Sequence, residues 1–192
     1  MYSKSISSVS TSGTGFPNYL ERMTYPQVEQ LATRTELALL PIGAPEAHGP
    51  HLPIGTDLIA ARELCERAAL ALTSRGIECL VAPLLPYCLA KVAEPFPGTI
   101  TVRAEVVAAL VADICRGLAR SGFRRILVVS GHAEEENLAV LRAGAEQAEK
   151  VGRWWRCPGG TGTPSRSCCT CCRRSILSTT CTPESGRRPW CC

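Results

Sequence analysis

The chain has 192 residues, the usual length of one domain, and its content of 45% apolar and 20% charged residues excludes global disorder. It contains no run of about 18 apolar residues, so the sequence offers no membrane-spanning helix. The net charge of +4 and the 12 Cys residues are unevenly distributed. Residues 1–150 hold four Cys and 14 Lys and Arg against 16 Asp and Glu, whereas residues 151–192 hold eight Cys, seven Arg and a single acid. The two segments therefore need separate interpretations.

The N-terminal segment, residues 1–22, is rich in Ser, Thr and Gly and has no sustained apolar period. This composition predicts a flexible leader. The segment also lacks the apolar region of a secretory signal, so we expect a cytoplasmic protein. Residues 26–35 predict a short helix, and Leu37–Ile42 is a near-continuous apolar run, typical of a buried parallel strand.

Strand, loop and helix then alternate along the chain to residue 150. Two further apolar runs, Ile77–Ala82 and Ile126–Val129, predict strands, and a loop with four prolines covers residues 83–100. Long amphipathic helices are predicted over residues 57–75, 103–121 and 136–150, the first two ended by Gly76 and Gly122. The alternation predicts βαβ units and hence an α/β fold with a largely parallel sheet and helices on both faces.

All three His residues lie in loops that follow predicted strands, where functional residues of parallel sheets gather. Residues 41–57, PIGAPEAHGPHLPIGTD, place Glu46 and His48 two residues apart and Asp57 at a helix start. Residues 127–137, LVVSGHAEEEN, place His132 and Glu134 two residues apart. Imidazole and carboxylate groups suit Zn²⁺ or Mn²⁺, and five ligands suit two ions that share a carboxylate.

Each of these residues also has a simpler interpretation when it is taken alone. A His in a loop rich in Gly and Pro is commonly just exposed or hydrogen-bonded. Asp57 alone would be a helix N-cap, and residues 134–136 would be a solvated first turn that the helix dipole favours. The spacing by itself therefore leaves the metal site open.

The segment PIGAPEAHGPHLPIGTD resembles the signature of the creatininase (creatinine amidohydrolase) family, in which an E-x-H-G-P-H-L-P stretch ends in an Asp. PFPGTITV (residues 95–102) is similar to the F-P-G-T segment of that family, and VVSGHAEEEN to its N-G-H loop. The three motifs occur in the family's order and cover about residues 23–150. The resemblance implies a three-layer α/β/α sandwich. It also implies a homo-oligomer, often a hexamer, with neither nucleic acid nor membrane as a partner.

The resemblance further implies a metal-dependent hydrolase of non-peptide amide-type C–N bonds, acting on a creatinine-like cyclic amide or a related small amide through a metal-activated water. By motif, Glu46, His48, Asp57, His132 and Glu134 match the family's dinuclear site, with Asp57 in the bridging place. Either Zn²⁺ or Mn²⁺ is compatible with these ligands. His51 also lies within the motif, but we expect it to order the loop through a hydrogen bond and assign it no ligand role.

Several positions depart from the family pattern. Ala47 stands where Gln is usual, Ser130 where Asn is usual, and Ala93 where a His often precedes the F-P-G-T segment. The text after His132 is Ala-Glu-Glu-Glu-Asn, which leaves open whether Glu134 or Glu135 is the ligand. We choose Glu134 because it preserves the His-x-Glu spacing.

The C-terminal part of the chain departs most from the family pattern. Family members continue into another αβ portion whose Glu/His-Ala-Gly segment supplies a catalytic His or Glu. No His follows His132 in this chain, and Glu184 is the single acid after Glu149, so the catalytic proton donor stays unassigned. We therefore expect an incomplete family fold. The alternative to an active enzyme is an inactive, truncated remnant that only binds metal or associates with homologous subunits.

Residues 151–192 form an Arg- and Cys-rich tail without a helical or strand period. Cys168 with Cys171, and Cys169 with Cys172, satisfy C-x-x-C, which makes a Cys-rich redox or zinc module a third hypothesis. A zinc site, however, needs a second well-spaced pair, which the tail lacks. Its dominant residues are those expected from out-of-frame translation of a GC-rich gene. We interpret the tail as non-native or disordered.

Overall fold

The computed structural model describes residues 17–149. Most of the predicted leader and the whole predicted tail lie outside these residues. The described elements are, in chain order, β1 (Asn18–Tyr19), the 3-10 helix η1 (Leu20–Arg22), α1 (Tyr25–Ala32), β2 (Leu37–Ile42), α2 (Thr56–Thr73), β3 (Leu80–Val81), α3 (Ala104–Arg120), β4 (Arg125–Ser130) and α4 (Glu135–Glu149).

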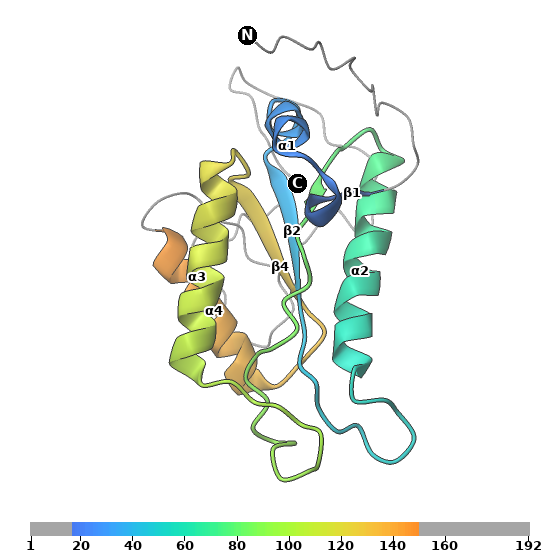
Figure 1. Ribbon diagram of the computed structural model, residues 1–192, viewed down its shortest axis with the longest axis vertical. Helices are drawn as coiled ribbons and strands as arrows, with labels where there is room; N and C mark the ends of the chain where they lie inside the picture. Colours follow the sequence, from blue (N-terminus) through green and yellow to red (C-terminus); the bar gives the residue numbers. More distant parts are fainter. Residues whose placement is uncertain (1–16, 150–192) are drawn as a thin grey trace, which may run out of the picture. The chain divides into compact units, whose positions relative to one another are not determined.

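The four strands form one parallel sheet in the order β1-β3-β2-β4 (Figure 1). β2 and β4 are neighbours and pair along their whole length, from Leu37 opposite Arg125 to Ile42 opposite Ser130. The two strands that precede the His-containing loops therefore run side by side and end together.

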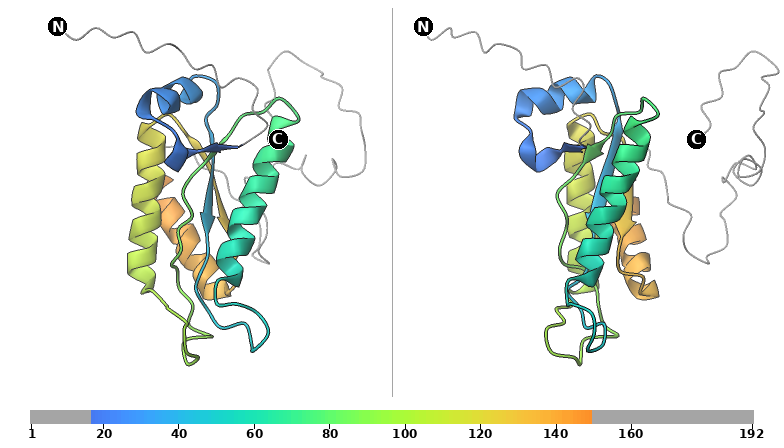
Figure 2. Two further views of the ribbon diagram at one scale, coloured as in Figure 1. Left: turned by 45° about the vertical axis from the view of Figure 1, so that its right-hand side comes forward. Right: turned by 90° about the vertical axis from the view of Figure 1, so that its right-hand side faces the viewer.

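Apolar side chains of β2 point alternately to the two faces of the sheet, as the pleat of a strand requires. Leu39 packs with Cys65 and Ala69 of α2 on one face. Ala38, Leu40 and Ile42 pack on the other face, in a cluster with residues of α1, α3 and α4. Helices thus cover both faces (Figure 2). This is the predicted three-layer α/β/α sandwich.

The pair α3 and α4 approach each other closely at Gly144. A Cβ atom at this position would lie 2.6 Å from the Ala108 carbonyl oxygen and 3.0 Å from Cβ of Val111. Only a residue without a side chain fits there, so Gly144 lets α4 pack onto α3.

Two elements differ from the predictions. Residues 18–22, which the composition assigns to the leader, belong to the fold, because Asn18 and Tyr19 pair with Leu80 and Val81 of β3. The strand predicted over Ile77–Ala82 is confined to Leu80–Val81, and Ile77 belongs instead to the turn that closes the end of α2. Gly76 adopts φ +75°, and the Ile77 N–H donates to the Leu72 carbonyl at 3.0 Å, as in a Schellman motif.

No helix within residues 17–149 combines the length and the apolar character needed to cross a membrane.

Candidate metal centre

Five predicted site residues come from three segments at the carboxyl edge of the sheet. Glu46 and His48 lie in the loop after β2, Asp57 lies in the first turn of α2, and His132 and Glu134 lie between β4 and α4. Since β2 and β4 are neighbours, both loops leave the sheet at the same edge, at the lower end of the view in Figure 1.

Two glycines at the strand ends bring Asp57 into this edge. Gly43 follows β2, and a Cβ atom there would lie 2.9 Å from the backbone C and O of Asp57. Gly131 follows β4, and a Cβ atom there would overlap the Asp57 carbonyl oxygen and lie 3.0 Å from the Ala61 nitrogen. The first turn of α2 therefore rests directly on the backbone of both strands, which sets its carboxylate between the two loops.

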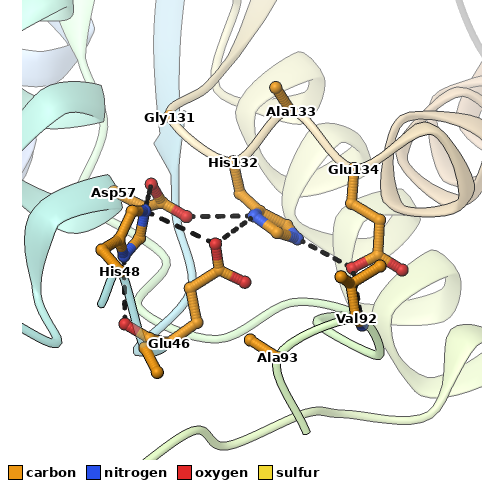
Figure 3. Close-up of a pocket in the computed structure, with 10 residues that line it drawn as sticks. Glu46, His48, Asp57, Val92, Ala93, Gly131, His132, Ala133 and Glu134 are labelled. Carbon is orange, nitrogen blue, oxygen red and sulfur yellow. Dashed lines mark hydrogen bonds and ion pairs between the residues drawn. The ribbon is translucent and has the colours of Figure 1, made fainter. Parts of the chain in front are cut away.

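Asp57 directs its two carboxylate oxygens at different histidines. Oδ1 lies 3.0 Å from Nε2 of His48, and Oδ2 lies 3.0 Å from Nδ1 of His132. Oε1 of Glu46 approaches the same two nitrogens, at 3.5 Å from His48 and 3.2 Å from His132. Figure 3 shows these four side chains converging from the two loops and from the first turn of α2. Glu46, Asp57 and His132 each offer one ligand atom within 4.8 Å of the others, the spacing of a metal-binding triad.

Glu134 lies on the opposite side of the His132 ring (Figure 3). Its Oε2 is 3.3 Å from Nε2 of His132 and accepts a hydrogen bond of 3.4 Å from the Val92 N–H. The structure thus brings four of the five predicted residues into one cluster and joins the fifth to it through His132.

The hydrogen bond at Nδ1 of His48 leaves its Nε2 available for a cation. Its Nδ1 lies 3.1 Å from the Glu46 carbonyl, which can only accept, so Nδ1 carries the proton. A neutral His48 then presents the lone pair of Nε2 to the Asp57 carboxylate, a contact that needs either a second proton or a cation. Although partial burial lowers the pKa of His48, the carbonyl of Glu46 and the charges of Asp57 and Glu46 raise it above the usual value.

Burial of the acidic groups also points to a bound cation. The side chains of Glu46 and Asp57 are 12% and 7% exposed, and within the described residues their ion-pair partners are histidines alone. Burial raises the pKa of Glu46, and the nearby Asp57 charge raises it further, against the attraction of His132. Oδ2 of Asp57 is buried and accepts no hydrogen bond, although it lies 3.0 Å from Nδ1 of His132. Two adjacent carboxylates and two imidazoles are a donor set that fits Zn²⁺ or Mn²⁺.

The site opens into a pocket of about 370 Å³. All five predicted residues line it, together with Ala47, Val92, Ala93, Gly131 and Ala133. Glu135 is exposed in the first turn of α4 and does not line this pocket. His51 is likewise exposed, with its ring against Gly49. The pocket geometry therefore supports Glu134 over Glu135.

Sequence reasoning missed the residues that support the site. The Ser130 hydroxyl and the fully buried Asn137 amide both donate to the carbonyl of His132, at 2.7 and 3.4 Å. The Thr99 hydroxyl accepts a hydrogen bond from the Ala47 N–H. Thr99 lies in the F-P-G-T segment, so that motif was the available signal, although the motif alone assigns no partner to the hydroxyl.

The chain is similar to proteins of a known family over most of its length. The family model "Creatininase: Creatinine amidohydrolase" matches residues 21–174, which is most of the chain. The chain belongs to the creatininase family. The family match runs past Glu149, the last described residue. The predicted membership is confirmed.

Two curated creatininase-like relatives differ in what they are named for. The mycofactocin precursor peptide peptidase of Mycobacterium tuberculosis (strain CDC 1551 / Oshkosh) is 30% identical over 139 residues, which cover 68% of this chain and 55% of the relative. The creatinine amidohydrolase of Pseudomonas putida is 30% identical over 128 residues, which cover 64% of this chain and 47% of the relative. The chain thus spans about half the length of these relatives.

Solved creatininase structures share the fold. A crystal structure of creatinine amidohydrolase (creatininase) aligns with a TM-score of 0.64 and 26% identity, over 73% of this chain and 57% of that chain. A structure described as "Creatininase Mn" aligns with a TM-score of 0.65 over 73% of this chain and 58% of that chain. Its 24% identity makes that second likeness one of fold alone.

Proposed function

We propose that the chain is a metal-dependent hydrolase that cleaves an amide-type C–N bond. The observation that carries this proposal is the buried triad of Glu46, Asp57 and His132, whose ligand atoms lie within 4.8 Å of one another in a pocket. The family supports the reaction class, because its curated relatives are named as a peptidase and an amidohydrolase.

Two ions, Zn²⁺ or Mn²⁺, would be held by the five residues. Glu46, Asp57 and His132 form the first set. His48 and the other oxygen of Asp57 would form the second, which would give Asp57 the bridging role; Glu134, which lines the same pocket, would join them by turning its carboxylate away from Nε2 of His132. When bound, such a pair lowers the pKa of a water molecule and polarises a carbonyl oxygen.

The residues of the chain prepare this site in three ways. The Glu46 carbonyl holds Nδ1 of His48, so that Nε2 faces the carboxylates. Glu134 lines the same pocket and contacts Nε2 of His132. Val92 and Ala93 add an uncharged wall to the pocket, beside which an amide group can lie.

The substrate is an amide that fits a pocket of about 370 Å³. The family resemblance implies non-peptide amides, but relatives of similar identity are named for a precursor peptide and for creatinine. The proposal therefore extends to peptide bonds as well as to small cyclic or linear amides. Assembly into a homo-oligomer remains a prediction from the family resemblance.

One observation favours a second candidate, a metal-binding protein without turnover. Every titratable side chain that lines the pocket is one of the five proposed ligands, so the described residues add no separate acid to protonate the leaving nitrogen. Loss of a general acid typically lowers a rate by about 10²–10⁴-fold. The chain would then bind metal and hydrolyse amides very slowly or not at all.

Metal content and hydrolysis, measured on the same preparations, test the proposal. The full chain is stripped with chelator, loaded with Mn²⁺ or Zn²⁺, and assayed with creatinine, a formamide and a short peptide. Asp57→Asn is compared with Asp113→Asn, a change of the one other Asp in the sequence. Asp113 is 74% exposed on α3, pairs with Arg116 and does not line the pocket.

We expect about two ions per chain in the parent and in Asp113→Asn, and one or none in Asp57→Asn. Metal-dependent hydrolysis of any of the three amides supports the enzyme. Bound metal without hydrolysis supports the second candidate. A parent chain that binds no more metal than Asp57→Asn overturns both.

A further inference from the structure

The long loop between β3 and α3 contacts the peptide that joins two of the proposed ligands. Oγ1 of Thr99 accepts a hydrogen bond of 3.0 Å from the N–H of Ala47. Ala47 lies between Glu46 and His48, and its own side chain is a methyl group. The hydroxyl therefore holds the N–H of the peptide that follows Glu46, in the short segment between these two site residues.

The peptide that precedes Glu46 is also paired, through both its carbonyl and its N–H. The Glu46 N–H donates to the Ile54 carbonyl at 3.0 Å, and the Ile100 N–H donates to the Pro45 carbonyl at 2.9 Å. Of these three contacts, the Thr99 contact is the one made by a side chain, so it is the one that a substitution can remove.

The preceding glycine makes the approach of Thr99 possible. Gly98 has φ +88°, and a Cβ atom there would lie 3.1 Å from Cδ1 of Ile54. The Thr99 N–H donates to the Phe96 carbonyl at 3.2 Å, which closes a turn over residues 96–99. The F-P-G-T segment thus folds into a tight turn that presents its Thr to the ligand loop.

We propose that Thr99 is a positioning residue of the metal centre, which sets the relative placement of Glu46 and His48 through the Ala47 peptide. The inference rests on the proposed function, because it assumes that these two side chains bind metal. Metal ligands must be held within about 0.5 Å of their productive positions, and groups that support them affect affinity without touching the ion.

Thr101 provides a matched control two residues away. Its hydroxyl also accepts a backbone hydrogen bond, of 2.9 Å, from the Ala90 N–H. Both threonines are half-buried in the same loop. The Thr101 contact lies within the loop itself, whereas the Thr99 contact reaches the segment that carries Glu46 and His48. Removing either hydroxyl disturbs the loop, but only one removal frees the Ala47 peptide.

Calorimetric titration of the chelator-stripped full chain with Mn²⁺ tests the proposal. The variants are Thr99→Val, which replaces the hydroxyl with a methyl group, Thr99→Ser, which keeps the hydroxyl, and Thr101→Val. We expect Thr99→Val to weaken Mn²⁺ binding by ~10-fold or more. Thr99→Ser and Thr101→Val should bind within about twofold of the parent. Circular dichroism confirms that each variant is folded, and Thr99→Ala replaces Thr99→Val if that variant does not fold.

Three results would overturn the proposal. Unchanged Mn²⁺ affinity in both Thr99→Val and Thr99→Ala would show that the hydroxyl does not act on the ligands. Equal weakening by Thr101→Val would show a general effect of the loop. A parent that binds no Mn²⁺ overturns the proposed function too, so the parent titration separates the two failures. Weakening confined to Thr99→Val and rescued by Thr99→Ser supports the positioning role.

Discussion

Gly131 lies against the backbone carbonyl of Asp57, in a gap that has no room for a Cβ atom. This contact joins the end of β4 to the first turn of α2 and brings the loop with His132 to the Asp57 carboxylate. Both partners are backbone atoms, so neither can move aside as a flexible side chain would. The packing around the metal centre therefore requires a glycine at position 131.

Gly131→Ala should destabilise the chain and weaken metal binding. The added methyl group has to displace the first turn of α2 or the end of β4, and overpacking of this kind costs about 1–3 kcal/mol. We expect a urea midpoint that falls accordingly, together with reduced Mn²⁺ affinity. Gly117→Ala is the control, because a Cβ atom there would meet just the Arg120 guanidinium at 3.8 Å. Gly117 lies inside α3, so its replacement should raise stability by about 0.5–1 kcal/mol. A Gly131→Ala chain as stable as the parent contradicts the packing argument.

Glu134→Gln should remove one of the two ions, whereas Glu135→Gln should leave both. Glu134 lines the pocket and contacts His132, while its neighbour is exposed at the start of α4. A Gln keeps the size of the side chain but not its charge. Metal content per chain, measured by mass spectrometry after gel filtration, distinguishes the pair. Loss of an ion from the Glu135→Gln chain instead would assign the ligand to that residue.

The metal-free chain should lose stability as the pH rises through the titration of Glu46 and His48. Both have a folded-state pKa above the ordinary values of 4.5 and 6.5, Glu46 chiefly through burial and His48 through its carbonyl and carboxylate neighbours. A group with a raised folded pKa stabilises the fold below its unfolded pKa, and this contribution disappears as the pH rises through the folded pKa.

Melting temperatures in chelator isolate the Glu46 part of this effect. The Gln side chain of Glu46→Gln cannot ionise. The melting temperature of this variant relative to the parent should therefore increase as the pH rises above about 4.5. Glu29→Gln, a change of an exposed residue on α1, serves as the control and should not gain in this way. If the melting temperature of Glu46→Gln instead falls relative to the parent over this range, the charged carboxylate is stabilised by the fold even without metal.

Four buried thiols should resist alkylation in the native chain. Burial raises the pKa of Cys65 and Cys88 to about 12 and that of Cys79 and Cys115 to about 11. Thiolates are the reactive species, and at about pH 8 these groups stay protonated as well as covered. Peptide mapping after iodoacetamide treatment should find them unlabelled, and labelled once the chain is unfolded in guanidinium. The charges of Asp57, Glu46 and Glu134 also raise the pKa of Cys88. Labelling of native Cys88 would therefore contradict its place in the core.

Hydrophobic periodicity was enough to predict most of the sandwich. Leu37–Ile42 is buried on both faces because α2 and α3 cover the sheet, and this produces the continuous apolar run that the sequence shows. β1 could not be predicted, since Asn18 and Tyr19 are two half-buried residues whose pairing with β3 depends on the finished sheet. The first residue of the Ile77–Ala82 run left the strand because the end of α2 captured its N–H.

The motifs predicted which side chains gather at the site but not how they contact one another. His48 and Asp57 are nine residues apart, and their contact depends on the loop path that Thr99, Ile54 and Gly43 determine together. The position of Glu134 depends on the Val92 N–H from a loop more than forty residues earlier. Long-range loop contacts of this kind leave no periodic signal in one sequence. The support from Ser130 and Asn137 was missed for the same reason.

The six-residue pairing of β2 with β4 means that a change of strand register far from the pocket would alter the metal centre. Each residue advances a strand by about 3.3 Å, so a slip of β4 by one position would carry His132 past Asp57 by roughly the length of a hydrogen bond. It would also turn every side chain of the strand to the wrong face. The pairing of Leu37 with Arg125, at the opposite end of the two strands, therefore helps to set the distance between His48 and His132. A single-residue deletion there would act on metal binding as a ligand mutation does.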